Sequence, residues 1–288
     1  MRIAIASDLH YHPRWHEALE RLAMHLAAQR PDLLVLAGDI GEPLNYFSEG
    51  LRVFHSVCDQ RAALAGNHDV WHRSFPHTSR QLWTVLLRKA ARLYGYHWLE
   101  QQNLTLGSLG ICGTMAWYDY GGRDPSLPYE VEDYEQLKAL VSNDARYIDW
   151  AWTDREFAQM IGVEFEDRLE MLQADPLISD VLVVTHVPLY RACLQEAIVP
   201  EISLTNAYYV NVSLGEVVRR YDKVRAVVSG HVHRGVSTTL PRENGQPPLV
   251  VYTIPADYGD PAAILLDTDT WEAAPIGASR QSWRWRSV

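Results

Sequence analysis

The chain has 288 residues, of which 47% are hydrophobic and 22% are charged, and its formal net charge is −10. This composition excludes a disordered, collagen-like or coiled-coil protein and is typical of a globular chain with one large core or two modest ones. The acidic balance argues against a protein that binds nucleic acid or an anionic membrane through a diffuse basic surface.

The cysteines and the N-terminus indicate where the protein works. Cys58, Cys112 and Cys193 are too few and too widely spaced for a disulfide framework or a Cys-x-x-Cys site. The apolar run after Met1 is too short for a signal peptide, and no stretch approaches the roughly 18 apolar residues of a membrane span. We therefore expect a cytoplasmic protein that does not associate with membranes.

Five short apolar runs predict strands, and helix-like segments separate the first three. In chain order, we expect strands at 3–6, 33–37, 62–65, 181–184 and 224–228, and helices at 16–30, 46–57 and 78–94. Short runs without a polar face are typical of strands that are covered on both sides. The alternation of strand and helix predicts an α/β fold built on a parallel sheet.

Each predicted strand is followed by side chains that can bind a metal ion. In open α/β sheets, ligands bind just beyond the carboxyl ends of the strands, so we expect these side chains to meet at one edge. In chain order they are Asp8 and His10, then Asp39, Asn67 and His186, and finally His231 and His233.

The types of these residues indicate the chemistry of the site. Carboxylate, amide and imidazole ligands without a thiolate suit hard or borderline divalent ions such as Mn, Fe or Zn. Seven ligands are too many for one tetrahedral ion, whereas two ions that share a carboxylate and a hydroxide hydrolyse phosphate esters. The sequence has no G-x-S-x-G elbow, Walker loop or G-x-G-x-x-G motif that would favour another chemistry.

The order of the motifs resembles that of the calcineurin-like metallophosphoesterases: Asp-x-His, Gly-Asp, Gly-Asn-His-Asp, a single His and Gly-His-x-His. The resemblance covers residues 1–112 and 180–266, whereas the stretch 113–179 matches only loosely, at residues 113–117 and at Asn143-Asp144. It implies a four-layer α/β/β/α sandwich with two metal ions at strand ends and a bridging hydroxide as nucleophile. The implied ligands are Asp8, His10 and His233 for one ion, Asn67, His186 and His231 for the other, and Asp39 as the bridge.

The resemblance also implies roles for the residues beside the ligands. His68 matches the family's histidine that binds no metal, and it lies close enough to a ligand to protonate the leaving group or stabilise its charge. Asp69 is expected to assist catalysis by orienting a ligand, or else simply to hold the turn at residues 66–68.

Three positions separate this chain from the protein Ser/Thr phosphatase branch of the family. In that branch, Gly-Asp continues to a second Asp followed by Arg, and Asn-His is followed by Glu, whereas the matching positions here are Glu42, Pro43 and Asp69. Because the phosphate-binding Arg is missing, the motifs look more like those of the phosphodiesterase, nucleotide-hydrolase and nuclease branches.

Three polar residues near the motifs are candidates for contacts with the substrate phosphate. His12 follows Asp-x-His, Arg73 follows Gly-Asn-His-Asp, and Arg234 follows Gly-His-x-His. For each of them, a place on the loop surface without a function is the alternative interpretation.

Residues 113–179 form an acidic, aromatic insert, because the spacing from Asn67 to His186 is far longer than one crossover requires. Positions 119–180 contain 16 acidic and 5 basic residues, so the rest of the chain is nearly neutral. We expect loops at 117–152 and a helix at 154–174 that Thr153 and Glu156 cap.

Two hypotheses account for the insert. The first is a lid that selects the substrate, with Trp117 and Tyr118 as contacts and a negative charge that excludes long nucleic acid. The second is a packed structural unit or a surface for oligomer formation.

The sequence thus predicts a single domain, residues 1–288, that uses two divalent metal ions to hydrolyse a small phosphodiester or nucleotide. The alternatives are a phosphomonoesterase or protein phosphatase, and a non-catalytic interaction module, against which the complete ligand set argues. The sequence does not give the oligomeric state, and a homo-oligomer is compatible with it. The Trp-Arg alternation at 283–286 is typical of an edge strand.

Overall fold

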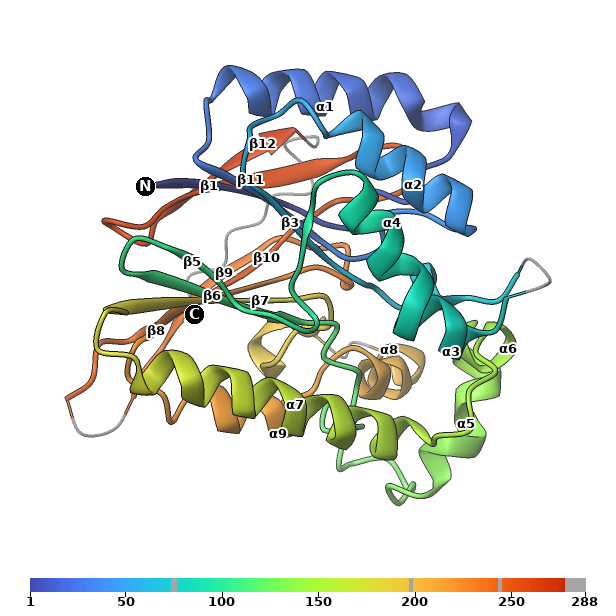
Figure 1. Ribbon diagram of the computed structural model, residues 1–288. Coiled ribbons are helices and arrows are strands. Elements are labelled where there is room, and N and C mark those ends of the chain that lie inside the picture. Colours follow the sequence, from blue (N-terminus) through green and yellow to red (C-terminus); the bar gives the residue numbers. More distant parts are fainter. Residues whose placement is uncertain (74–76, 197–198, 243–244, 278–288) are drawn as a thin grey trace.

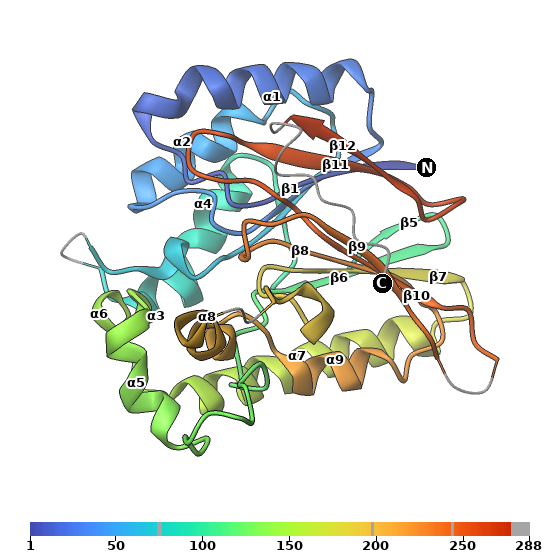
Figure 2. The same cartoon turned by 180° about the vertical axis from the view of Figure 1, so that it is seen from behind.

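The computed structural model describes residues 1–73, 77–196, 199–242 and 245–277. Within them, two mixed six-stranded sheets face each other, and helices cover the outer face of each sheet (Figures 1 and 2). This is the four-layer α/β/β/α arrangement that the family resemblance implies. The Trp-Arg alternation at 283–286 lies outside the described residues.

The first sheet carries the N-terminal strands. Its order is β12 (Ala273–Gly277), β11 (Ala262–Asp267), β1 (Arg2–Ala6), β2 (Leu33–Ala37), β3 (Arg61–Leu64) and β4 (His97–Trp98). The order of the second sheet is β5 (Leu104–Leu106), β6 (Leu109–Thr114), β7 (Asp180–Thr185), β8 (Val224–Ser229), β10 (Leu249–Thr253) and β9 (Val236–Leu240).

The five predicted strands correspond to β1, β2, β3, β7 and β8, but the expectation that they share one parallel sheet is wrong. The first three lie in one sheet and the last two in the other. Each sheet also contains antiparallel strands: β11 pairs with β1 in the first sheet, and β9 pairs with β10 in the second. The reason lies in how each strand is covered. In β1, Ile3 and Ile5 pack between the sheets, whereas Ala4 and Ala6 face the helices. A continuous apolar run indicates two covered faces without indicating what covers them.

Helices on the first sheet come from the N-terminal third of the chain. They are α1 (His16–Ala28), α2 (Leu44–Val53), α3 (Ser79–Gln81) and α4 (Leu87–Leu93), with a π-helical turn at Leu82–Leu86 between the last two. The expected helices at 16–30, 46–57 and 78–94 are therefore present, with shifted ends.

On the second sheet lie α7 (Asp154–Ala174), α8 (Pro200–Thr205) and α9 (Val212–Val218), while α5 (Asp133–Val141) and α6 (Asp144–Tyr147) extend to one side (Figure 1). The capping box of α7 forms as predicted, with Thr153 and Glu156 exchanging hydrogen bonds. The stretch 117–152, expected to be loop-rich, contains α5 and α6. No helix in the described part of the chain has the length and apolarity to cross a bilayer.

Glu100 is buried next to β3, where its Oε1 accepts a hydrogen bond from the backbone N–H of Ala65 at 3.2 Å. Burial raises the pKa of Glu100 to about 7, although the nearby charge of Arg168 opposes the rise. Since the unfolded chain loses this proton nearer to pH 4.5, the folded state binds the proton more tightly between these two values. The ionisation of this carboxyl therefore lowers the free energy of unfolding as the pH rises from 4.5 to 7. Above pH 7, its contribution stays constant.

Glu100→Gln keeps the acceptor oxygen and removes the ionisation. We expect the metal-free variant to be more stable than wild type at pH 8 by about 3 kcal/mol, and nearly equal to it at pH 5. Urea denaturation at the two pH values measures this difference, and Glu17→Gln on an exposed face of α1 serves as the control. A stability difference between Glu100→Gln and wild type that is the same at both pH values would contradict the prediction.

Candidate metal centre

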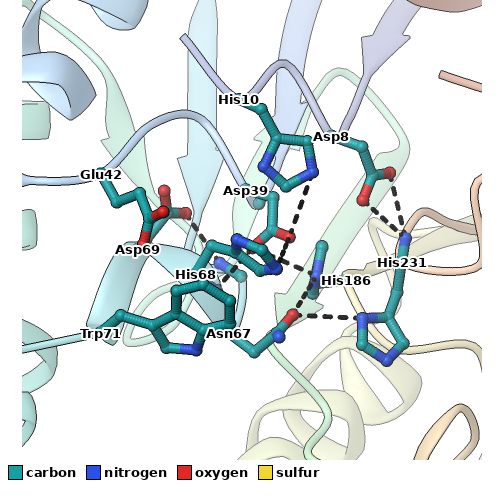
Figure 3. Close-up of polar contacts among 12 residues, drawn as sticks. Asp8, His10, Asp39, Glu42, Asn67, His68, Asp69, Trp71, His186 and His231 are labelled. Carbon is teal, nitrogen blue, oxygen red and sulfur yellow. Dashed lines mark hydrogen bonds and ion pairs between the residues drawn. The ribbon is translucent and has the colours of Figure 1, made fainter. Parts of the chain in front are cut away.

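The loops that follow five strands bring the predicted ligands together (Figure 3). In each of three groups, the ligand atoms lie within 4.8 Å of one another. Because the groups share members, they form one continuous cluster that draws on both sheets. The groups are Asp8 with His10 and His233, His10 with Asp39 and His68, and Asp8 with Asp39 and His186.

Asn67 and His231 complete the cluster on the side of His186. The Asn67 Oδ1 atom lies 3.0 Å from His186 Nε2 and 3.1 Å from His231 Nδ1. All seven ligands that the sequence predicts after the strands are therefore neighbours in space.

The backbone of this cluster adopts conformations that side chains other than glycine rarely take. Asp8, His10, Asp39, His231 and His233 have φ angles between 42° and 69°. Such conformations raise the free energy of the folded state and gather at functional sites, where the surrounding structure must hold them. Backbone hydrogen bonds do so here: the N–H of His10, for example, donates to the carbonyl of Asp39 at 2.8 Å.

Three of the histidines have one ring nitrogen held by an outer acceptor. His186 Nδ1 lies 3.0 Å from the Ala37 carbonyl oxygen, and His231 Nε2 lies 3.1 Å from the carbonyl of Tyr208. His233 Nδ1 lies 3.2 Å from the Asp257 carboxylate. Because these acceptors require an N–H, the other ring nitrogen of each histidine faces the cluster, where a metal ion can bind it once it carries no proton.

The electrostatics of the cluster favour positive charge between its carboxylates. Burial opposes ionisation of Asp39, but nearby histidines, His186 first among them, hold the pKa of its carboxyl well below the usual range. Burial likewise opposes protonation of His186, yet Asp39 raises the pKa of that ring to about 9. Two fully buried carboxylates, Asp8 and Asp39, thus require cationic partners. The donor set fits divalent metal ions, which would take the place of those protons.

His68 follows the predicted ligand Asn67 and begins the short helical turn His68–Val70. Its ring stacks on Trp71 with the centroids 3.6 Å apart, and its Nε2 lies 3.9 Å from an Asp39 oxygen (Figure 3). Burial lowers the pKa of His68 to about 3, so the ring is neutral and retains one N–H. The buried Nδ1 has no hydrogen-bond partner among the described residues. A neutral ring in this position can donate a hydrogen bond to a ligand oxygen.

Asp69 faces away from the cluster and joins two loops. Its carboxyl oxygens accept hydrogen bonds from the backbone N–H groups of Gly41 and Gly66, each at 2.9 Å. These contacts hold the turns that carry Asp39 and Asn67. Gly66 is required at this crossing, since a Cβ there would lie 2.1 Å from Asp39 Oδ1.

A pocket of about 390 Å³ opens over the cluster. Arg73 lines it, 2.9 Å from Glu42, with its guanidinium over the rings of Trp71 and Tyr147. Residues 141–144 of the insert form another part of the wall. The insert therefore contributes directly to the site.

The other candidate substrate residues lie elsewhere. His12 is exposed and its Nδ1 accepts a hydrogen bond from the Arg14 backbone, while Arg234 lines a neighbouring cavity of about 470 Å³. Trp117 and Tyr118 are 0% exposed, because they pack inside the insert with their polar atoms bonded to buried aspartates. They have no free surface to offer a substrate in this structure.

Three further residues contact the predicted ligands or His68. Trp71 lies under His68, Tyr258 stacks on His10 with the centroids 4.1 Å apart, and Asp144 accepts a hydrogen bond from Asn67. Tyr258 lies far from the ligand motifs along the chain, so local patterns do not connect it with the site. For Asp144, the signal in the sequence is the loose family match at Asn143-Asp144.

The family described as calcineurin-like phosphoesterase matches residues 1–235. Comparison with curated proteins finds no match. Among solved structures, the chain is similar to the phosphopantetheinyl hydrolase from Mycobacterium tuberculosis, with 20% identity over 87% of each chain and a TM-score of 0.67. It is also similar to a dimetal phosphatase from Danio rerio, with 15% identity over 97% of this chain and 99% of that one and a TM-score of 0.52. At these identities, the two structures show the fold.

Proposed function

The chain belongs to the calcineurin-like phosphoesterase family and is a metal-dependent phosphoesterase, and on this premise we propose that it hydrolyses a small phosphodiester. The observation that carries the proposal is the charge of the pocket over the cluster. Among the described residues that line this pocket, Arg73 is the one lysine or arginine.

The proposed ligand set follows the grouping of the side chains. Asp8, His10 and His233 would hold one divalent cation, and Asp39 would be shared with the second. The second cation would be held by Asn67, His186 and His231. When bound, the two cations activate water for attack on phosphorus and neutralise charge on the phosphoryl group; manganese, iron and zinc all suit these donors.

The charge beside the cluster favours a diester over a monoester. A phosphodiester carries one negative charge, whereas a monoester carries up to two near neutral pH. Arg73 is already paired with Glu42 at 2.9 Å, so it adds less than one full positive charge to the pocket. This balance suits a monoanionic phosphate.

The volume of the pocket favours a small substrate. About 390 Å³ lies at the lower end of the range for small-molecule sites. In the proposed function, the segment 141–144 of the insert acts as a fixed wall that limits the size of the ester and excludes long nucleic acid and folded phosphoproteins.

His68 is proposed to act on the leaving group. Stacking on Trp71 fixes the plane of its ring, and the ring lies beside Asp39 at the bottom of the pocket. A neutral N–H in this place donates a hydrogen bond to the leaving oxygen as negative charge develops on it. Asp69 is a positioning residue in this scheme, since it holds the two loops on which the reacting groups stand.

A panel of substrates with Mn²⁺ tests the substrate class. It compares bis-aryl and mono-aryl phosphates, cyclic nucleotides and single-stranded DNA, and a phosphopantetheinyl ester because a phosphopantetheinyl hydrolase has a similar fold. We expect kcat/KM for the bis-aryl phosphate to exceed that for the mono-aryl phosphate by roughly tenfold or more. A preference for the mono-aryl phosphate would overturn the diester proposal.

Arg73→Gln is expected to raise KM for the bis-aryl phosphate by roughly 10-fold to 100-fold, because one charge-assisted hydrogen bond to the phosphate is lost. The content of bound metal should stay the same. Steady-state kinetics measure the change, and Arg80→Gln, whose guanidinium lies over Trp152 outside the pocket, is the control. An unchanged KM in Arg73→Gln would remove Arg73 from the substrate site.

A further inference from the structure

Asp144 connects the insert with the residues that follow β3. Its Oδ1 accepts hydrogen bonds from Asn67 Nδ2 at 3.0 Å and from Trp71 Nε1 at 2.7 Å. Its Oδ2 accepts a hydrogen bond from the hydroxyl of Tyr118 at 3.0 Å. The side chain is 2% exposed, so these three donors replace the water that the carboxylate would otherwise bind.

The first contact determines how the amide of Asn67 is oriented. An amide group has one end that donates and one that accepts, whereas a carboxylate only accepts. Asp144 therefore faces the NH₂ end, and Oδ1 must point the other way, where it lies 3.0 Å from His186 Nε2 and 3.1 Å from His231 Nδ1. A metal ion there needs the oxygen and not the NH₂ group.

The second contact, the hydrogen bond from Trp71 to Asp144, fixes the ring on which His68 stacks. Trp71 stacks on the His68 ring with an angle of 25° between the planes. Because its indole N–H is bound to Asp144, Trp71 has one preferred rotation, and the ring above it has one preferred plane. One carboxylate thus orients a ligand of one cation and the histidine that faces the leaving group.

We propose that Asp144 is a positioning residue for metal binding and hydrolysis: it selects the ligand orientation of Asn67 and, through Trp71, the orientation of His68. This inference rests on the ligand set of the proposed function. It assigns the insert a role in the metal centre itself, through a residue 77 positions away from Asn67 along the chain.

The insert contains a second buried aspartate that serves as a matched control. Asp154 accepts hydrogen bonds from the Trp117 indole at 2.7 Å, the Tyr120 hydroxyl at 2.5 Å and Lys138 Nζ at 2.6 Å. Its surroundings copy those of Asp144, one indole and one phenol included. The difference lies in the third donor, which is an ammonium group for Asp154 and the amide of a ligand for Asp144.

The experiment titrates metal-free wild type, Asp144→Asn, Asp154→Asn and Asn67→Ala with Mn²⁺ and follows binding by calorimetry. For Asp144→Asn, we expect the second of two ions to bind roughly 10-fold to 100-fold more weakly, the usual effect of removing an outer partner of a ligand. Asn67→Ala should weaken the same ion. Asp154→Asn should unfold at a lower temperature and bind both ions within about twofold of wild type.

The outcomes separate this inference from the ligand assignment. If Asn67→Ala binds two ions like wild type, the proposed ligand set fails and the inference fails with it. If Asn67→Ala loses affinity and Asp144→Asn does not, the ligand set stands and the role of Asp144 is refuted. Equal losses in Asp144→Asn and Asp154→Asn would show a merely structural effect and also refute it.

Trp71→Phe tests whether Asp144 orients His68 through Trp71, and it keeps the proposal falsifiable if Asp144→Asn does not fold. The variant retains the aromatic stack and removes the indole N–H. We expect it to bind two Mn²⁺ ions like wild type, with kcat for an alkyl diester lowered several-fold and KM nearly unchanged. An unchanged kcat would exclude control of His68 through Trp71.

Discussion

Asp39→Asn is expected to lower the rate of phosphoester hydrolysis by on the order of a thousandfold and to leave the protein with fewer than two bound metal ions. In the proposed ligand set, Asp39 is shared between the two ions, since its carboxylate lies 3.7 Å from His10 of one ion's set and 3.4 Å from His186 of the other's. The amide of asparagine has nearly the same shape, but it offers one neutral oxygen in place of two charged ones. Activity assays and elemental analysis of the metal-loaded protein measure the two effects.

The same substitution has a clear control. Asp180→Asn also removes a carboxylate, one that pairs with Arg225 at 2.8 Å at the opposite end of β7 from the cluster. This variant should retain full metal content and activity. If Asp39→Asn bound two ions and hydrolysed substrate at the wild-type rate, the assignment of the bridging ligand would be wrong.

His68→Gln is expected to lower kcat by roughly 10²-fold to 10⁴-fold for a diester with an alkyl leaving group, while two metal ions remain bound. The reason is that an alkoxide accumulates much negative charge and depends on a hydrogen bond or proton from His68. A nitrophenolate spreads that charge over its ring and depends on the histidine less. We therefore expect the loss for a nitrophenyl diester to be at least tenfold smaller.

The comparison of leaving groups is the measurement that decides the role of His68. Single-turnover kinetics with the two diesters separate the chemical step from product release. His16→Gln, on the outer helix α1, provides a control histidine that pairs with Glu20 at 3.0 Å and does not line the pocket. Equal losses for both leaving groups in His68→Gln would indicate that the residue supports the fold of the site and not the departure of the leaving group.

The outer contacts of the cluster explain why the order of the motifs is so informative. Asp69 holds the loops of Asp39 and Asn67 through backbone N–H groups, and the carbonyls of Ala37 and Tyr208 fix the rings of two histidines. Most of these partners lie within a few residues of a strand end. The local sequence therefore contains both the candidate ligands and much of what orients them.

The sequence by itself determined the kinds of candidate ligand and their places in the chain. Asp8, Asp39 and Asn67 directly follow apolar runs, and a strand with its exit loop is a local feature that a sequence pattern can indicate. It also predicted the capped helix α7, since both residues of the capping box lie within one helical turn. The family resemblance added the sandwich and the grouping of the ligands.

The tertiary structure alone decided how distant segments meet. It divided the five strands between two sheets, because the pattern of a buried strand is the same whether a helix or a second sheet covers it. It buried Trp117 and Tyr118 and brought Asp144 to Asn67, 77 residues away. Contacts of this kind depend on the packing of whole layers, and no short stretch of the chain contains the information that specifies them.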